Sequence, residues 1–227
     1  MRVRRFLVWS GLDDGLPVET ATVDLGADGL RATGVQIGAD PVPYRVDYDL
    51  DATDAGSRSD TDQGAGGFGT RRLTVRAVGA GWSRALELTR SDDGRWACTS
   101  SATGHPAGVR FPSPGTEAPS ALTGASDCDL GLSPLTNAMP VLRHGLHRGP
   151  GARDLLTAWV SVPDLAVRPY PQRYEHVGRH PRGVAGEDAG GSVVRFVDGG
   201  LFPGFVADLD LDADGFVVFY PHLARRR

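Results

Sequence analysis

Hydrophobic and polar residues alternate in short runs along most of the chain. A clear example is the run YRVDY at positions 44–48, in which apolar and charged side chains take turns. Alternation with a period of two is typical of a β-strand that buries one face. Together with the segment at 3–8, such runs predict about fifteen strands and little helix. The main ones lie at 30–37, 44–48, 73–77, 83–89, 95–101, 141–146, 154–162, 165–170, 192–197, 204–211 and 215–220.

Short glycine-containing segments separate these runs. The sequences DDG, ADG, GAG and SDDG supply the positive φ angles that tight hairpin turns require. A single sheet with this many strands leaves exposed edges unless it curls toward closure. We therefore expect an all-β fold in which one large antiparallel sheet is curled into an incomplete, half-open barrel with a concave face.

The strand pattern covers the chain as a single domain, residues 1–227, with two inserts. The first, DAGSRSDTDQGAGGFG at 54–69, has low complexity and predicts a flexible loop. The second, at 102–124, holds four Pro and four Gly with almost no periodicity, and it predicts another flexible connection. The first insert interrupts a meander formed by the first hundred residues, and the second separates that meander from the strands that follow.

Composition narrows the class of protein. With 40% hydrophobic and 23% charged residues, the 227-residue chain can bury a core, and a net charge of −4 argues against a nucleic-acid partner. The apolar run Phe6–Trp9 is too short for an export signal, and nowhere do eighteen apolar residues run together. These features predict a cytoplasmic protein without a transmembrane segment, in which Cys98 and Cys128 are reduced core residues.

Motifs for cofactors and metals are incomplete. Gly64, Gly66 and Gly69 match a dinucleotide-binding pattern but lack a strand before them and a helix after them. Counting from Asp210, the sequence starts like a calcium loop, yet Pro221 occupies the position that needs a bidentate Glu. No metal and no cofactor are therefore expected.

Asp127 and Asp129 form the clearest pair of carboxylates. At positions i and i+2 of a strand, both side chains point to the same side. Two acids on one face can share a proton and act as acid and base. The favoured interpretation is structural: the two carboxylates accept hydrogen bonds from loop backbone or from Arg143.

The segment DCDLGLSPLTNAMPVLRHGL at 127–146 is the densest in the sequence. Ser133 before Pro134 is a plausible N-cap for one helical turn, and Met139–Pro140 predicts extended chain beyond it. The segment resembles the signature of the bacterial putative glycolipid-binding family, and PQRYEHVG at 171–178 and the closing hairpin from 208 onward resemble later parts of that family. The matching positions of the signature are Asp127, Asp129, Leu130, Pro134, Thr136, Asn137, Pro140 and Arg143, and the opening strands match at 6–9 and at Glu19.

The resemblance implies an incompletely closed β-barrel, similar to bacterial lipoprotein carriers, that binds glycolipid as one domain. A sugar or phosphate at the mouth of such a barrel favours aromatic faces and forked hydrogen-bond donors. Combined with the paired carboxylates, the candidates for contact with a lipid-like or glycolipid-like ligand are Trp82, Trp96, Asp127, Asp129, Asn137, Arg143, Gln172 and Tyr174.

Three functions remain open at this point. The first is a carrier or sensor that encloses an amphiphile in the concave face, and it is favoured over catalysis. The second is an enzyme, a hydrolase or transferase acting on a similar amphiphile, with Asp127 and Asp129 as acid and base. The third is a structural domain whose interior is filled by its own side chains. The sequence leaves the oligomeric state open.

Overall fold

The computed structural model describes residues 2–53, 67–179 and 191–227, and these parts form one fourteen-stranded sheet. The all-β class and the near-absence of helix are therefore confirmed. In chain order the strands are β1 (Val3–Gly11), β2 (Val18–Gly26), β3 (Gly29–Gly38), β4 (Tyr44–Thr53), β5 (Arg72–Gly79), β6 (Trp82–Arg90), β7 (Trp96–Gly104), β8 (Asp127–Leu130), β9 (Ala152–Val160), β10 (Val167–Arg179), β11 (Ser192–Asp198), β12 (Val206–Leu211), β13 (Val217–Tyr220) and β14 (Ala224–Arg226). The helices are the 3-10 turn η1 (Pro119–Leu122) and α1 (Ala138–Arg143).

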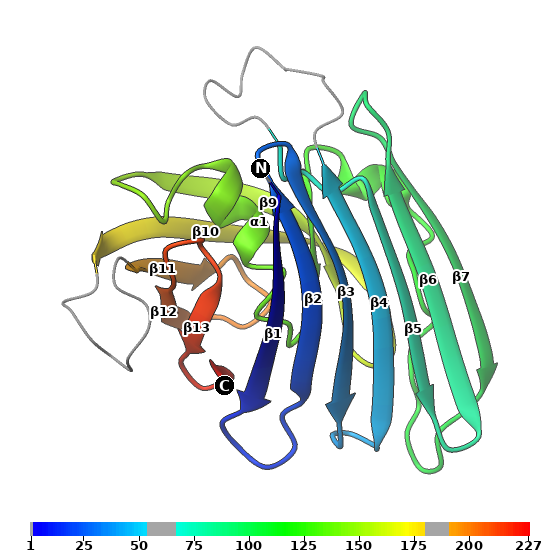
Figure 1. Cartoon of the computed structure of the whole chain (residues 1–227). Coiled ribbons are helices and arrows are strands. Elements are labelled where there is room, and N and C mark those ends of the chain that lie inside the picture. Colours follow the sequence, from blue (N-terminus) through cyan, green and yellow to red (C-terminus); the bar gives the residue numbers. More distant parts are fainter. Residues whose placement is uncertain (1, 54–66, 180–190) are drawn as a thin grey trace.

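Two antiparallel meanders make up the sheet. One runs from β7 back to β1, and the other runs from β14 back to β9, with β8 added in parallel at the far edge. They join where β1 pairs with β14 over three residue pairs, from Trp9–Arg226 to Gly11–Ala224; we call this junction the seam. The sheet curls without closing, as Figure 1 shows, so the predicted half-open barrel is confirmed.

Three glycines face large aromatic rings across neighbouring strands. Gly34 pairs with Tyr48, Gly38 with Tyr44, and Gly79 with Trp82. In each pair the ring occupies the space of the missing side chain; a Cβ at Gly34 would lie 2.2 Å from the Tyr48 ring. Rings that cover glycines in this way allow a sheet to curve while its inner face stays packed.

Residues 105–126 join the two edge strands, β7 and β8, across the inner face of the sheet (Figure 1). Phe111 packs edge-on against Trp82 at 5.1 Å between ring centres, and Gly115 bridges to Ala166 beside β10. The turn η1 contacts β7 of the first meander and β9 and β10 of the second, and its residue Leu122 is buried. The space enclosed by β1–β7 is therefore filled by this segment rather than left hollow.

The predicted strand at 141–146 is wrong, because residues 141–143 belong to α1 and residues 144–146 form the turn after it. Pro140 is the third residue of this helix, where a missing backbone N–H removes no intrahelical hydrogen bond. Met139–Pro140 therefore does not extend the chain. Ser133 is not a helix cap either, since its hydroxyl donates to Glu19, and Asn137 occupies the N-cap position of α1.

Ion pairs between neighbouring strands cover the outer face of the sheet. They include Arg4–Asp24 and Arg195–Asp208, which lie directly across two strands, and the diagonal pair Arg72–Glu87. Opposite charges placed directly across two strands stabilise the pairing modestly. Asp208, the first acid of the alternating run at 208–214, is thus paired with Arg195 on the neighbouring strand. Neither helix in the described parts of the chain is long or apolar enough to cross a membrane.

Candidate functional site

An apolar pocket lies on the inner face of the second meander. The helix α1 and the segment after β8 cover only part of this face, and the pocket lies where they leave the face uncovered. Its volume is about 450 Å³, which is within the usual range for small-molecule sites. We call it the aromatic pocket, because six rings line it. They belong to Trp159, Tyr170, Phe196, Phe202, Phe205 and Tyr220.

The rings of the aromatic pocket support one another. Trp159 lies 6.3 Å from Tyr170 and 6.2 Å from Phe202, centre to centre, in edge-to-face geometry. Phe205 contacts both Phe196 and Tyr220. Such pairs stabilise by about 1 kcal/mol each beyond the burial of apolar area. The wall is thus held in place by mutual packing, although the Phe202 side chain itself is exposed.

Residues beside the seam complete the pocket wall. Leu16 comes from the turn between β1 and β2, and His222 and Leu223 come from the turn between β13 and β14. The two turns are joined by the hydrogen bond that the Leu12 N–H donates to the Leu223 carbonyl at 3.1 Å. His222 has a φ of 64°, an uncommon backbone conformation for a residue other than glycine. Both meanders therefore contribute to one pocket.

Asp129 supplies the charge at the pocket. Its Oδ2 accepts a hydrogen bond from Gln172 Nε2 at 2.6 Å, and its Oδ1 accepts one from the Thr136 hydroxyl at 2.9 Å. Burial raises the pKa of Asp129 to about 6, against these two hydrogen bonds, and the charge of Asp127 adds to the rise. The carboxylate is therefore fixed in position and poorly solvated.

A second layer of hydrogen bonds supports Asp129. Asn137 Nδ2 donates to the Tyr174 hydroxyl at 2.7 Å, and that hydroxyl donates to Gln172 Oε1 at 3.3 Å. Asn137 also lines the pocket, whereas Gln172 and Tyr174 lie behind it. The amide of Gln172 therefore connects the carboxylate to the helix start at Asn137.

Glu19, on β2, is a second buried acid that reaches the pocket through one neighbour. Its Oε1 accepts hydrogen bonds of 2.6 Å from the hydroxyls of Tyr48 and Ser133, and Ser133 lines the pocket. Burial raises the pKa of Glu19 to about 7, and the two hydroxyl hydrogen bonds oppose the rise. Glu19 was not among the candidates for ligand contact. It is in phase with the buried residues Ala21 and Val23, and that period-two position is the signal that could have identified it.

The structure places the eight candidate residues in three groups. Asp129 and Asn137 line the aromatic pocket, and Gln172 and Tyr174 bond to them from behind. Asp127 and Arg143 form a buried ion pair of 2.6 Å outside the pocket lining. Asp127 and Asp129 share one side of β8, as their spacing predicts, because Cys128 and Leu130 pack into the main core on the other side.

Trp82 and Trp96 lie in the core of the first meander, away from the aromatic pocket. Trp82 contacts Phe111, and Trp96 Nε1 donates to the Ala125 carbonyl at 3.0 Å. Sequence reasoning did not single out the rings that line the pocket. Phe202 stands in a Gly- and Pro-containing turn outside any predicted strand, and Phe205 lies at the start of the predicted strand at 204–211 without any sign of a pocket, so only their aromatic character could have drawn attention to them.

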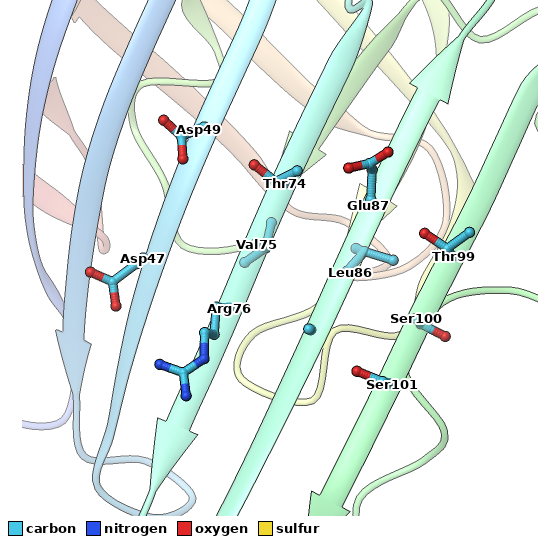
Figure 2. A pocket seen from close by; sticks show the side chains of 11 residues that line it. Asp47, Asp49, Thr74, Val75, Arg76, Leu86, Glu87, Thr99, Ser100 and Ser101 are labelled. Carbon is cyan, nitrogen blue, oxygen red and sulfur yellow. The ribbon is translucent and has the colours of Figure 1, made fainter.

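A second depression lies on the outer face over β4–β7 and measures about 540 Å³. Figure 2 shows Asp47, Asp49, Arg76 and Glu87 standing on this surface, and no aromatic ring lines it. It is open, and most of its lining residues are polar or charged, so it is a weaker candidate than the aromatic pocket for an apolar ligand. Within residues 2–53, 67–179 and 191–227, no cluster of three His, Cys, Asp or Glu residues could hold a metal ion.

Comparisons with known proteins agree with this architecture. The model of the family described as "Putative glycolipid-binding" matches residues 6–226. Among solved structures, a DUF1089 family protein from Pseudomonas aeruginosa matches with a TM-score of 0.60 and 23% identity. The match covers 96% of this chain and 97% of that one, and at this identity it shows the fold alone. A comparison with curated proteins gives no match.

Proposed function

Because the chain belongs to the putative glycolipid-binding family, we propose that it binds a glycolipid or related amphiphile, part of which lies in the aromatic pocket. The observation that carries this proposal is the set of six rings around a pocket that also contains the Asp129 carboxylate. Apolar walls with a few fixed polar groups are the usual composition of a small-molecule site. The filled inner face of the first meander restricts the ligand to this pocket.

The size of the pocket limits what it can hold. At about 30 Å³ per water-sized group, 450 Å³ accommodates roughly fifteen non-hydrogen atoms. This is enough for a sugar ring or a single short chain, and too little for a complete two-chain lipid. About ten buried methylenes contribute about 8 kcal/mol before the costs of association and ordering are subtracted. Such a ligand therefore binds by one end.

We assign the protein a binding role, as a carrier or a sensor, rather than catalysis. Asp127 is engaged by Arg143, and both oxygens of Asp129 accept hydrogen bonds from protein groups. Neither carboxylate is therefore arranged as an open acid or base. An uncovered apolar pocket also argues against a purely structural domain. The cytoplasmic location expected from the N-terminal sequence stays a prediction, and the oligomeric state stays open.

Binding of octyl glucoside tests this proposal. We expect the purified protein to bind it in calorimetric titration below the micelle concentration, and Phe205→Ala to weaken binding by about tenfold, since a buried ring contributes 1.4 kcal/mol or more. Phe219→Ala is the matched control, because Phe219 packs against Arg225 and does not line the pocket. Native mass spectrometry of the protein as purified checks for a copurified amphiphile. If neither octyl glucoside nor any copurified amphiphile is bound, the proposal is wrong.

A further inference from the structure

The aromatic pocket carries one carboxylate that no Lys or Arg in its wall balances. Asp129 is the one Asp, Glu, Lys or Arg among the described residues that line the pocket, and His222 is the one imidazole. The nearby Arg143 is engaged by Asp127. A desolvated carboxylate without a counter-charge is unfavourable, because low-dielectric surroundings penalise the ion. The pocket therefore favours a positively charged group of a ligand.

The rings add to this preference. The face of an aromatic ring is electrostatically negative and attracts an organic cation within about 6 Å of its centre. Beyond burial, which is the main cause, the Asp129 charge contributes to raising the pKa of Tyr170 and Tyr220, so both lie within electrostatic reach of the carboxylate. The negative ring faces and the carboxylate therefore both attract a cation in the same pocket.

The Tyr220 hydroxyl offers a hydrogen-bonding group at the pocket. The Tyr220 ring is buried and lines the pocket, but its oxygen is not one of the buried polar atoms that lack a partner among the described residues, so it is open to the pocket space. A ligand that displaces water from this oxygen has to replace its hydrogen bond. An ammonium N–H can do so as a donor.

We propose that the aromatic pocket binds the ammonium group of a cationic amphiphile, with the Asp129 carboxylate as counter-charge and the rings of Trp159 and Tyr220 against the cation. This rests on the proposed function and narrows its ligand class. An amino sugar or an amino alcohol supplies such a group in a glycolipid. Phosphate, sulfate and carboxylate headgroups are disfavoured, because a second desolvated anion would lie beside Asp129.

Three octyl amphiphiles of different charge test the proposal in calorimetric titrations at about pH 8, where Asp129 is ionised. They are octylammonium, octyl glucoside and octyl sulfate. We expect octylammonium to bind about tenfold more tightly than octyl glucoside, because the carboxylate and the ring faces attract the cation, and octyl sulfate to bind more weakly than either. Asp129→Asn should reduce the affinity for octylammonium to that for the glucoside. Asn can still accept from Gln172, and its amide can donate to Thr136, so the variant is nearly isosteric.

Asp154→Asn is the matched control, because Asp154 pairs with Arg173 on the exposed face of β9 and β10. We expect it to keep the preference for the ammonium. If Asp129→Asn fails to fold, competition replaces it: methylammonium should displace octylammonium from the unmodified protein. Equal binding of glucoside and ammonium, an unchanged preference in Asp129→Asn, or no displacement overturns the cation proposal and leaves amphiphile binding standing. Failure of all three amphiphiles to bind, with no copurified amphiphile on the purified protein, overturns the proposed function itself.

Discussion

Nη1 of Arg143 donates a hydrogen bond to Oδ1 of Asp127 at 2.6 Å, and both side chains are more than nine-tenths buried. Arg143 is the last residue of α1, and Asp127 is the first residue of β8. The ion pair therefore fastens the helix to the short strand that carries Asp129. Its two charges stabilise the fold only as a pair, because either one alone is a buried ion without compensation.

Removing one partner of this pair should be strongly destabilising. We expect Arg143→Met to lower the free energy of unfolding by about 3–5 kcal/mol, as measured by urea denaturation. Adding Asp127→Leu to it should restore part of that loss, because no buried charge then remains. Arg173→Met removes an exposed pair with Asp154 and should cost less than about 1 kcal/mol. A double variant less stable than Arg143→Met alone would contradict this interpretation.

Glu19 should make the protein less stable as the pH rises. Its pKa is about 7 in the folded protein and 4.5 for the unperturbed group, so between these values the folded state binds more protons than the unfolded state. Stability then falls through this range and levels off above about pH 7. Glu19→Gln keeps an acceptor for Tyr48 and Ser133 but carries no charge, so it should gain up to about 3 kcal/mol at high pH.

Urea denaturation at a series of pH values measures this effect. Glu175→Gln is the control, because Glu175 is exposed and should leave the pH profile unchanged. The prediction fails if Glu19→Gln and the unmodified protein lose stability in parallel between pH 5 and pH 8.

A methyl group at Gly34 should displace the Tyr48 ring on the neighbouring strand, and with it the hydrogen bond from Tyr48 to Glu19. The new Cβ would meet the Tyr48 ring at 2.2 Å, and the hydroxyl of that ring donates to Glu19. We expect Gly34→Ala to destabilise the protein by about 1–3 kcal/mol through overpacking, as measured by thermal denaturation. Gly178→Ala, on β10, is the control, because nothing lies within 4 Å of its added Cβ. If both substitutions change the melting temperature by the same amount, the Tyr48 ring moves aside without loss of stability and the prediction is wrong.

The two tryptophans expected from the sequence to contact ligand should affect stability instead. Trp96→Phe removes one of the two hydrogen bonds to the Ala125 carbonyl, which also accepts from Arg90 Nε at 3.1 Å, and we expect a cost of about 1 kcal/mol. Affinity for octyl glucoside should not change, because Trp96 does not line the pocket. Trp159→Phe should reduce affinity with a smaller loss of stability. Urea denaturation and calorimetry separate the two effects, and weaker ligand binding by a fully stable Trp96→Phe protein would return this residue to the binding site.

Local pattern was enough to predict most of the sheet. The run at 44–48 shows why, since its alternation places Tyr44, Val46 and Tyr48 on the buried side of β4, as observed. The strand at 141–146 failed because apolar spacing over six residues fits one helical turn as well as a strand, and Pro140 suits the first turn of a helix. Short apolar segments do not carry enough periodicity to decide between the two.

The site could be predicted only in part. Asp129 and Asn137 stood out because they occur in a dense polar motif, and both line the pocket. Trp82 and Trp159 have similar alternating surroundings in the sequence, yet only the inner face at Trp159 is left uncovered. Which rings face a pocket depends on where residues 105–126 lie across the sheet, and that path is set by long-range contacts such as Phe111 on Trp82.

The seam has a consequence for how a ligand enters. Only three residue pairs join β1 to β14, and residues on both sides of that junction, Leu16 and Leu223, line the pocket. Short ladders open locally at far lower free energy than the long ones in β3–β5. The backbone amides of Leu12 and Arg227, which donate across the seam to the carbonyls of Leu223 and Val8, should therefore exchange with deuterium well before those of β4. We expect local opening of the sheet at this point to widen the uncovered pocket, so that the proposed amphiphile needs no dedicated lid to enter.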